Sequence, residues 1–199
     1  MSEFLIYLRL GFDHITDLNG YDHILFVVVL CAIYRPNDWQ KVLILITAFT
    51  LGHSITLALA TLQFISYSTA LIEFLIPVTI LFTAISNFFY KEPNLSSRKK
   101  SKGQTLRYFV AMAFGFIHGM GFSNYLRSLL GQEDSILKPL FAFNLGLEFG
   151  QIIIVIFSLG FSFLLIDIFR VKKHDWKLIL SGIVAGIVLT MIATRWGAI

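Results

Sequence analysis

The chain has 199 residues, of which 56% are hydrophobic and 14% are charged, and its mean hydropathy is +0.76. A soluble domain carries about 25% charged residues, so this composition excludes an ordinary water-soluble domain and predicts a polytopic membrane protein. The net charge of +4 comes from basic residues in short loops between apolar runs, so it indicates membrane topology and we expect no nucleic-acid partner.

Residues 1–18 precede the first long apolar run. Their apolar side chains fall near helical spacing, which predicts either an interfacial helix or a segment that re-enters the bundle. Six apolar runs follow, and they predict about six spanning helices, because one span needs about 20 residues. These runs are Tyr21–Tyr34, Val42–Leu62, Thr69–Tyr90, Leu106–Phe122, Pro139–Phe169 and Leu178–Trp196.

The expected fold class is all-α, a single transmembrane helical bundle over residues 1–199. The apolar runs lack the alternation that a membrane β-barrel requires. Residues 1–18 are expected to be peripheral or re-entrant, and residues 91–105 form a basic loop between two spans.

The loops predict the orientation of the bundle. Twelve of the sixteen Lys and Arg residues lie in the loops 35–41, 91–107 and 170–177, which share one side of the membrane. Loops rich in Lys and Arg stay in the cytoplasm. We therefore expect a multi-pass protein of a bacterial inner membrane, with both termini outside the cytoplasm.

This orientation brings the ionisable residues of the spans to one depth. A charged group at mid-membrane costs at least about 2.5–3.5 kcal/mol, so such groups normally face partners or a wet cavity. Several of them in the outer half of the bundle predict one shared cavity that opens to the outside. The residues are His14, Asp22, His23, His53, Glu73, His118 and Glu148.

Each of these residues also has a structural interpretation. Asp22 follows Asn19 by three positions, so it could serve as the acidic residue in the first turn of a helix. His14 could lie at the interface, and His53 or His118 could bond a neighbouring helix. Four unrelated structural histidines in one layer remain the competing interpretation.

The chemistry of the set favours a metal ion. Imidazole nitrogens and a carboxylate suit zinc, nickel or a related divalent ion. We expect the ligands to come from His14, Asp22, His23, His53 and His118.

Further acidic and amide residues are candidates for supporting roles. Glu73 lies four residues before Pro77, which frees the Glu73 carbonyl from its helical bond. Asn144, Glu148 and Gln151 recur at helical spacing and form one polar stripe. We expect Glu73 and Gln151 to support the ligands, and Glu148 to support them or handle protons.

Four motifs resemble the HupE/UreJ family of hydrogenase and urease accessory membrane proteins. They are "GFDHITDLNGYDHILF" (11–26), "FTLGHSITLALA" (49–60), "FGFIHGMGFSN" (114–124) and "FNLGLEFGQ" (143–151). The family is regarded as nickel or cobalt permeases, so the resemblance implies transport or handling of a divalent metal. Its proposed helix signature falls here on His14, Asp22 and His23.

A zinc-dependent intramembrane hydrolase is the alternative. Seven residues separate His14 from Asp22, where the family signature has five, and His118 is the only histidine of its motif. The inner half of the bundle also has few acids, which favours a one-sided site. A hydrolase of a lipid or amide substrate would use Glu148 for protons and Ser54 or Asn144 to stabilise an oxyanion.

Overall fold

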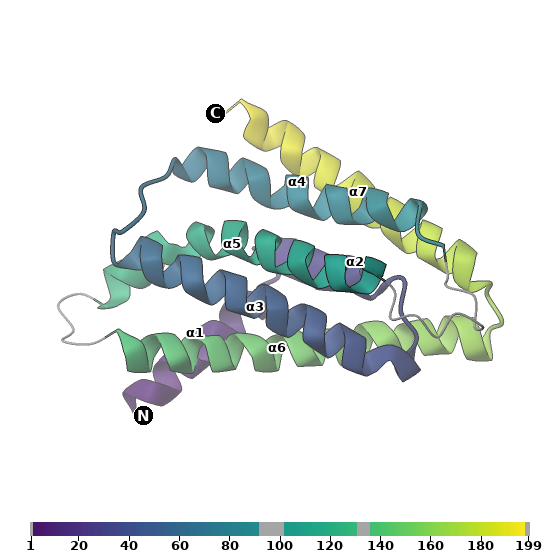
Figure 1. The fold of residues 1–199 in the computed structure, drawn as a ribbon, viewed down its shortest axis with the longest axis horizontal. Helices are drawn as coiled ribbons and strands as arrows, with labels where there is room; N and C mark the ends of the chain where they lie inside the picture. Colours follow the sequence, from purple (N-terminus) through teal and green to yellow (C-terminus); the bar gives the residue numbers. More distant parts are fainter. Residues whose placement is uncertain (1, 92–101, 131–135, 198–199) are drawn as a thin grey trace.

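The computed structural model describes residues 2–91, 102–130 and 136–197. These residues form seven α-helices and no strand, which confirms the all-helical fold class (Figure 1). The helices are α1 (Glu3–Thr16), α2 (Asp22–Cys31), α3 (Trp39–Thr61), α4 (Thr69–Phe88), α5 (Lys102–Leu130), α6 (Leu137–Phe163) and α7 (Lys173–Trp196). A π-helical turn, Leu164–Ile168, extends α6.

Four helical segments are long and apolar enough to cross a membrane, so the expectation of about six spans is not confirmed. They are Pro36–Thr61, Thr69–Phe88, Leu137–Ile168 and Lys173–Trp196. The apolar α2 has only 10 residues, about 15 Å at 1.5 Å per residue, which is half the hydrocarbon thickness. Among the apolar residues of α5 lie glycines, His118, Ser123 and Asn124, which lower its hydropathy.

The loop predicted at 91–105 falls mostly outside the described residues. Its last part is helical, because α5 begins at Lys102 rather than near Leu106. The turns around 35–38 and 170–172 lie toward one end of the bundle, and the α3–α4 connection and both chain ends lie toward the other (Figure 1).

The short helix α2 lies at the centre of the bundle and contacts α4, α6 and α7. Most of its residues are buried, including Phe26 and Val29, as expected for a helix that is apolar on every face. The Asn87 side chain on α4 donates a hydrogen bond of 2.8 Å to the Val29 carbonyl. This central position takes the first residues of α2, Asp22 and His23, into the interior.

Glycines bring two pairs of helices into backbone contact. On the α3–α5 pair, a Cβ on Gly119 would collide with the carbonyl oxygen of His53. On the α1–α6 pair, a Cβ on Gly11 would collide with the carbonyl of Phe143, and one on Gly146 with the carbonyl of Leu8. Small residues permit this close approach in membrane helices. Each pair thereby holds a histidine, His14 or His53, next to its partner helix.

The segment expected to be interfacial or re-entrant forms α1. Its buried residues, Tyr7, Gly11 and Ile15, face the bundle. The Gly11 and Gly146 contacts place it across the first half of α6. Its last turn, which carries His14, therefore points into the bundle interior.

Candidate metal site

Three histidines from three different helices meet in the interior. One ring nitrogen of each of His14 (α1), His23 (α2) and His53 (α3) lies within 4.8 Å of the corresponding atoms of the other two. The ring centroids are 4.7 Å apart for His14 and His23, 5.9 Å for His14 and His53, and 6.0 Å for His23 and His53. We call these three residues the histidine cluster. This spacing makes the three rings a candidate set of ligands for one ion.

The cluster carries buried nitrogens that the described residues leave without a hydrogen bond. These are Nε2 of His14, Nε2 of His23 and both ring nitrogens of His53. His53 is 0% exposed. Buried polar atoms are almost always paired, so an unpaired group calls for a specific explanation. A divalent cation bound by imidazole lone pairs supplies one, and the donor set suits zinc or nickel.

Asp22 contacts His23 and is not one of the three residues of the histidine cluster. Its Oδ1 lies 3.0 Å from Nδ1 of His23 and also accepts the His23 backbone N–H at 2.9 Å. Because a carboxylate accepts, Nδ1 carries the proton and the lone pair is on Nε2. A carboxylate behind a ligating histidine fixes the tautomer and raises the basicity of the ligand. We predicted Asp22 as a ligand. In the structure its carboxylate hydrogen-bonds to His23, and its role as a ligand stays a prediction.

His118 on α5 adds a fourth imidazole beside the cluster. Its ring centroid is 5.1 Å from that of His23. Its Nε2 lies 3.0 Å from the hydroxyl of Thr79, and this hydroxyl donates to the Ile76 carbonyl at 2.7 Å. The Thr79 oxygen is therefore the acceptor for His118, and Nδ1 of His118 is left with a lone pair. Nδ1 is buried, and no described residue bonds to it.

Aromatic rings enclose the cluster. The Phe122 ring centroid is 4.0 Å from that of His14, and Phe143 is 5.7 Å from His14. Phe49 is 6.1 Å from His53 and 5.1 Å from His118. Apolar walls of this kind lower the local dielectric and strengthen the interaction of an ion with its ligands.

Arg195, near the end of α7, closes the site on the side of Asp22. Its guanidinium lies 3.8 Å from the Asp22 carboxylate and donates to the Glu73 carbonyl at 2.6 Å. That carbonyl is free because Pro77 lacks the N–H that would bond to it, as the sequence predicted. A cavity of about 180 Å³ adjoins Asp22 and Arg195.

The Glu73 side chain is exposed, and this residue contacts Arg195 through its backbone carbonyl. The sequence did not predict a role for Arg195. The Glu73 carbonyl, which Pro77 leaves without a helical hydrogen bond, could have indicated that a donor such as Arg195 lies nearby.

The polar stripe of α6 faces α3. The hydroxyl of Thr47 donates to Glu148 at 2.7 Å, and the hydroxyl of Thr50 donates to Gln151 at 2.8 Å. We call Thr47, Thr50, Glu148 and Gln151 the threonine–acid layer. Thr47 and Thr50 precede His53 by six and three residues, so the layer begins within one turn of the cluster.

Two residues proposed for the hydrolase alternative have different surroundings. Ser54 donates its hydroxyl to the Thr50 carbonyl in the same helix at 2.6 Å. The side-chain oxygen of Asn144 is buried and without a partner in the described part of the chain. Neither residue belongs to the three-histidine group.

The fold and the site together define a class of protein. Four apolar helices long enough to span and a buried histidine cluster indicate a multi-pass membrane protein with a candidate metal site. The sequence matches the family described as "HupE / UreJ protein" over residues 1–198, so the chain belongs to the HupE/UreJ family. Searches of the curated proteins and of the solved structures gave no match.

Replacing Asp22 with asparagine is expected to weaken metal binding about 10- to 100-fold, because an amide is a weaker acceptor for the His23 ring than a carboxylate. Calorimetric titration of the detergent-purified protein with Ni²⁺ or Zn²⁺ measures this change. Asp13→Asn is the control, since Asp13 is exposed and pairs with Arg9 at 3.4 Å. Equal affinities for Asp22→Asn and the unaltered protein would show that the carboxylate does not tune the site.

Proposed function

We propose that this protein binds a divalent transition-metal ion at the histidine cluster and transports it across the membrane, with nickel as the leading candidate. The observation that carries the proposal is the meeting of three imidazoles from three helices, two buried and one half-buried, with buried ring nitrogens left unpaired by the described residues. Membership of the HupE/UreJ family supports a metal as the transported substrate.

In this proposal His14, His23 and His53 hold the ion, and His118 is positioned to replace a ligand or add one. Asp22 holds His23 in the tautomer that offers Nε2. Ionisable residues within membrane helices commonly mark an ion pathway. A shared set of ligands from separate helices also allows the ion to be released when those helices shift relative to one another.

The threonine–acid layer favours transport rather than a metal site that opens to only one side of the membrane. It continues the polar path from His53 toward the start of α3. Glu148 supplies a carboxylate to this path, and the Thr47 hydroxyl donates to it at 2.7 Å. Carboxylate and hydroxyl oxygens bind divalent ions less tightly than imidazoles bind nickel. This difference would let the ion leave the cluster in one direction.

We further propose that the cluster faces the outer compartment of a bacterial inner membrane. The positive-inside rule supports this orientation, because the turns around 35–38 and 170–172 adjoin most of the described loop cations. The chain ends lie toward the other end of the bundle (Figure 1). A cysteine-accessibility scan of loop positions would test it.

Zinc-dependent hydrolysis is the second candidate, and one observation favours it. Three imidazoles leave a fourth position open, which is the arrangement of catalytic zinc sites that activate water. The substrate would be a lipid or amide that enters from the membrane. Such an enzyme would hold zinc tightly and move no metal across the bilayer.

Metal uptake by vesicles that contain the purified protein tests the proposed function. We expect inward flux of Ni²⁺ above that of empty vesicles. Replacing Glu148 with glutamine should lower the flux at least about tenfold, since a barrier change of about 1.4 kcal/mol is tenfold in rate. The same variant should bind the ion with unchanged stoichiometry.

The results of the uptake and binding measurements distinguish transport from hydrolysis. Tight zinc without flux would reject transport and favour the hydrolase. A protein that binds neither metal would reject both. Full flux in Glu148→Gln would show that the threonine–acid layer is not part of the path.

A further inference from the structure

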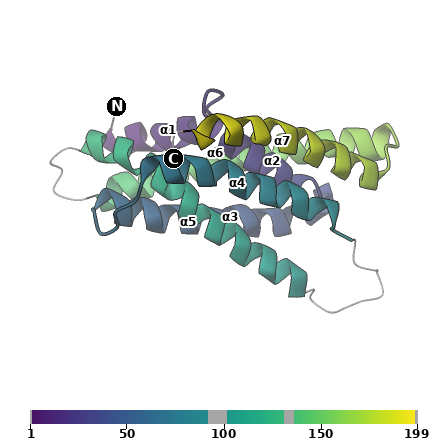
Figure 2. The same ribbon diagram turned by 90° about the horizontal axis from the view of Figure 1, so that it is seen from above.

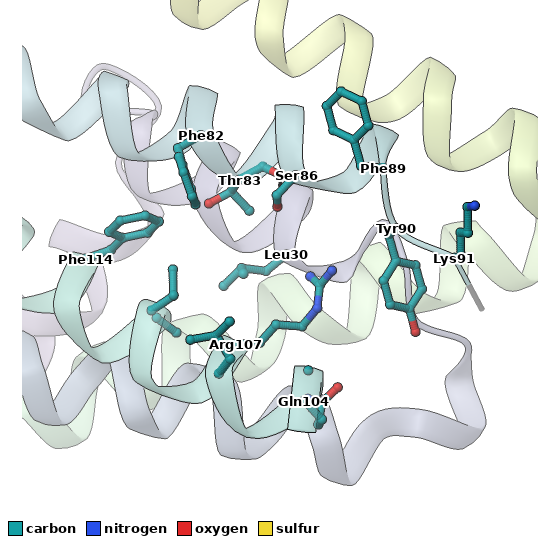
Figure 3. Close-up of a pocket in the computed structure, with 14 residues that line it drawn as sticks. Leu30, Phe82, Thr83, Ser86, Phe89, Tyr90, Lys91, Gln104, Arg107 and Phe114 are labelled. Carbon is teal, nitrogen blue, oxygen red and sulfur yellow. Dashed lines mark hydrogen bonds between the residues drawn. The ribbon is translucent and has the colours of Figure 1, made fainter. Parts of the chain in front are cut away.

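A second cavity, of about 550 Å³, lies between α4 and α5, away from the histidine cluster (Figure 3). Figure 2 shows that the first half of α5 runs away from α4, and the cavity lies where the two helices diverge. Arg107, which lines the cavity, precedes His118 by eleven residues of α5, roughly 16 Å of helix rise. None of the histidines of the candidate metal site lines this cavity.

One part of this cavity is apolar. Leu30, Val110 and Phe114 line it, with Phe82 from α4. The rings of Phe82 and Phe114 meet edge to face, with centroids 5.7 Å apart, and they close the cavity at this end (Figure 3). Such a lining accepts a hydrocarbon chain and offers no hydrogen bond to a polar ligand.

The other part is cationic. Arg107 and Lys91 both line it, and in Figure 3 the Arg107 guanidinium points into the space between the two helices. The guanidinium carbon lies 4.6 Å from the centre of the Tyr90 ring. No ion pair joins Arg107 to a carboxylate within residues 2–91, 102–130 and 136–197. An anion brought to this end would meet a guanidinium that no carboxylate of these residues pairs with.

The mouth of the cavity opens on the surface that lipid would cover. Phe89 on one rim is 79% exposed, and Leu106 on the other is 63% exposed. Exposed apolar side chains of this size fit a lipid environment. A ligand that enters here has an apolar tail and a charged end, because the lining offers both.

We propose that this cavity binds one anionic phospholipid, with the phosphate at Arg107 and an acyl chain against Phe82 and Phe114. Charge complementarity identifies the occupant, because two basic side chains meet an apolar channel and no described acid balances them. Arginine binds phosphate oxygens through paired N–H groups. Basic pockets between transmembrane helices bind phosphorylated lipid headgroups in this way.

Native mass spectrometry of the detergent-purified protein tests the proposal with two lipids that share acyl chains, phosphatidylglycerol and phosphatidylcholine. We expect phosphatidylglycerol to bind at least about fivefold more tightly than phosphatidylcholine. One basic side chain near a membrane surface changes the affinity for an anionic lipid by about this factor. Arg107→Gln should remove this preference. Arg127→Gln, at the other end of α5, is the matched control and should keep it.

A second variant tests the acyl chain. Ser86 lines the cavity, and its hydroxyl bonds only to the Thr83 carbonyl of its own helix among the contacts described. Ser86→Phe should fill the channel and lower the binding of both lipids at least fivefold without a change in charge. Circular dichroism shows whether each variant is folded.

Equal binding of the two lipids, or an equal loss in Arg107→Gln and Arg127→Gln, would overturn the proposal. Displacement of phosphatidylglycerol by inorganic phosphate would also overturn it and would indicate a site for free phosphate. Full lipid binding by Ser86→Phe would show that the chain lies elsewhere.

Discussion

Alanine at position 53 is expected to reduce the affinity for a divalent ion by more than about 100-fold. His53 is a member of the histidine cluster, with both ring nitrogens buried and unpaired among the described residues. Loss of a residue that only supports a ligand costs 10- to 100-fold in affinity, and loss of a ligand itself should cost more. Elemental analysis of the purified variant measures the bound metal.

His174→Ala is the control for this experiment. His174 is exposed at the start of α7 and lines a separate cavity near Lys91 and Lys177. Its replacement should leave the metal content unchanged. If His53→Ala keeps the full stoichiometry while it remains folded, the histidine cluster is not the metal site.

A methyl group at Gly146 is expected to destabilise the bundle by about 1–3 kcal/mol and to lower the metal affinity as well. The added Cβ would collide with the Leu8 carbonyl on α1. Because backbone cannot move aside as a side chain can, α1 must shift away from α6. The shift would carry His14 away from His23 and His53.

Gly186→Ala on α7 is the matched control, because nothing lies within 4 Å of a Cβ built there. It should leave metal binding unchanged and stabilise α7 by up to about 1 kcal/mol, since alanine favours helix over glycine. Thermal unfolding in detergent, with and without the metal, compares the two variants. Equal effects from both substitutions would show that the α1–α6 contact does not position His14.

The sequence predicted four of the five long helices closely, whereas α5 extends beyond its apolar run at both ends. Hydropathy located α3, α4, α6 and α7, because a long apolar run in oil has only the helix to satisfy its backbone. It did not predict that α2 ends after ten residues at the bundle centre. The length of an apolar run does not reveal whether lipid or protein covers it.

The sequence predicted which residues belong to the candidate site, but it did not predict how their side chains are arranged. Depth and topology placed His14, His23 and His53 in one layer, and the structure brings these three together. The positions of Asp22 and Arg195 depend on the rotation of α2 and α7 about their axes. That rotation is set by contacts between helices, which a linear pattern does not encode.

Several hydrogen bonds between helices could be identified only from the structure. The bond from His118 to Thr79 joins α5 to α4, and the bonds of Thr47 and Thr50 join α3 to α6. The sequence placed these threonines in spans but could not pair them. The assignment of Asp22, His118 and Glu148 to particular roles is therefore part of the proposal, as is the outward orientation of the bundle.

X-ray absorption spectroscopy of the protein loaded with Zn²⁺ tests the central claim most directly, because it reports the atoms around the ion. We predict at least three imidazole nitrogens at about 2.0–2.1 Å, and fewer imidazoles in His53→Ala. An ion surrounded only by oxygen would contradict the claim that His14, His23 and His53 share one metal.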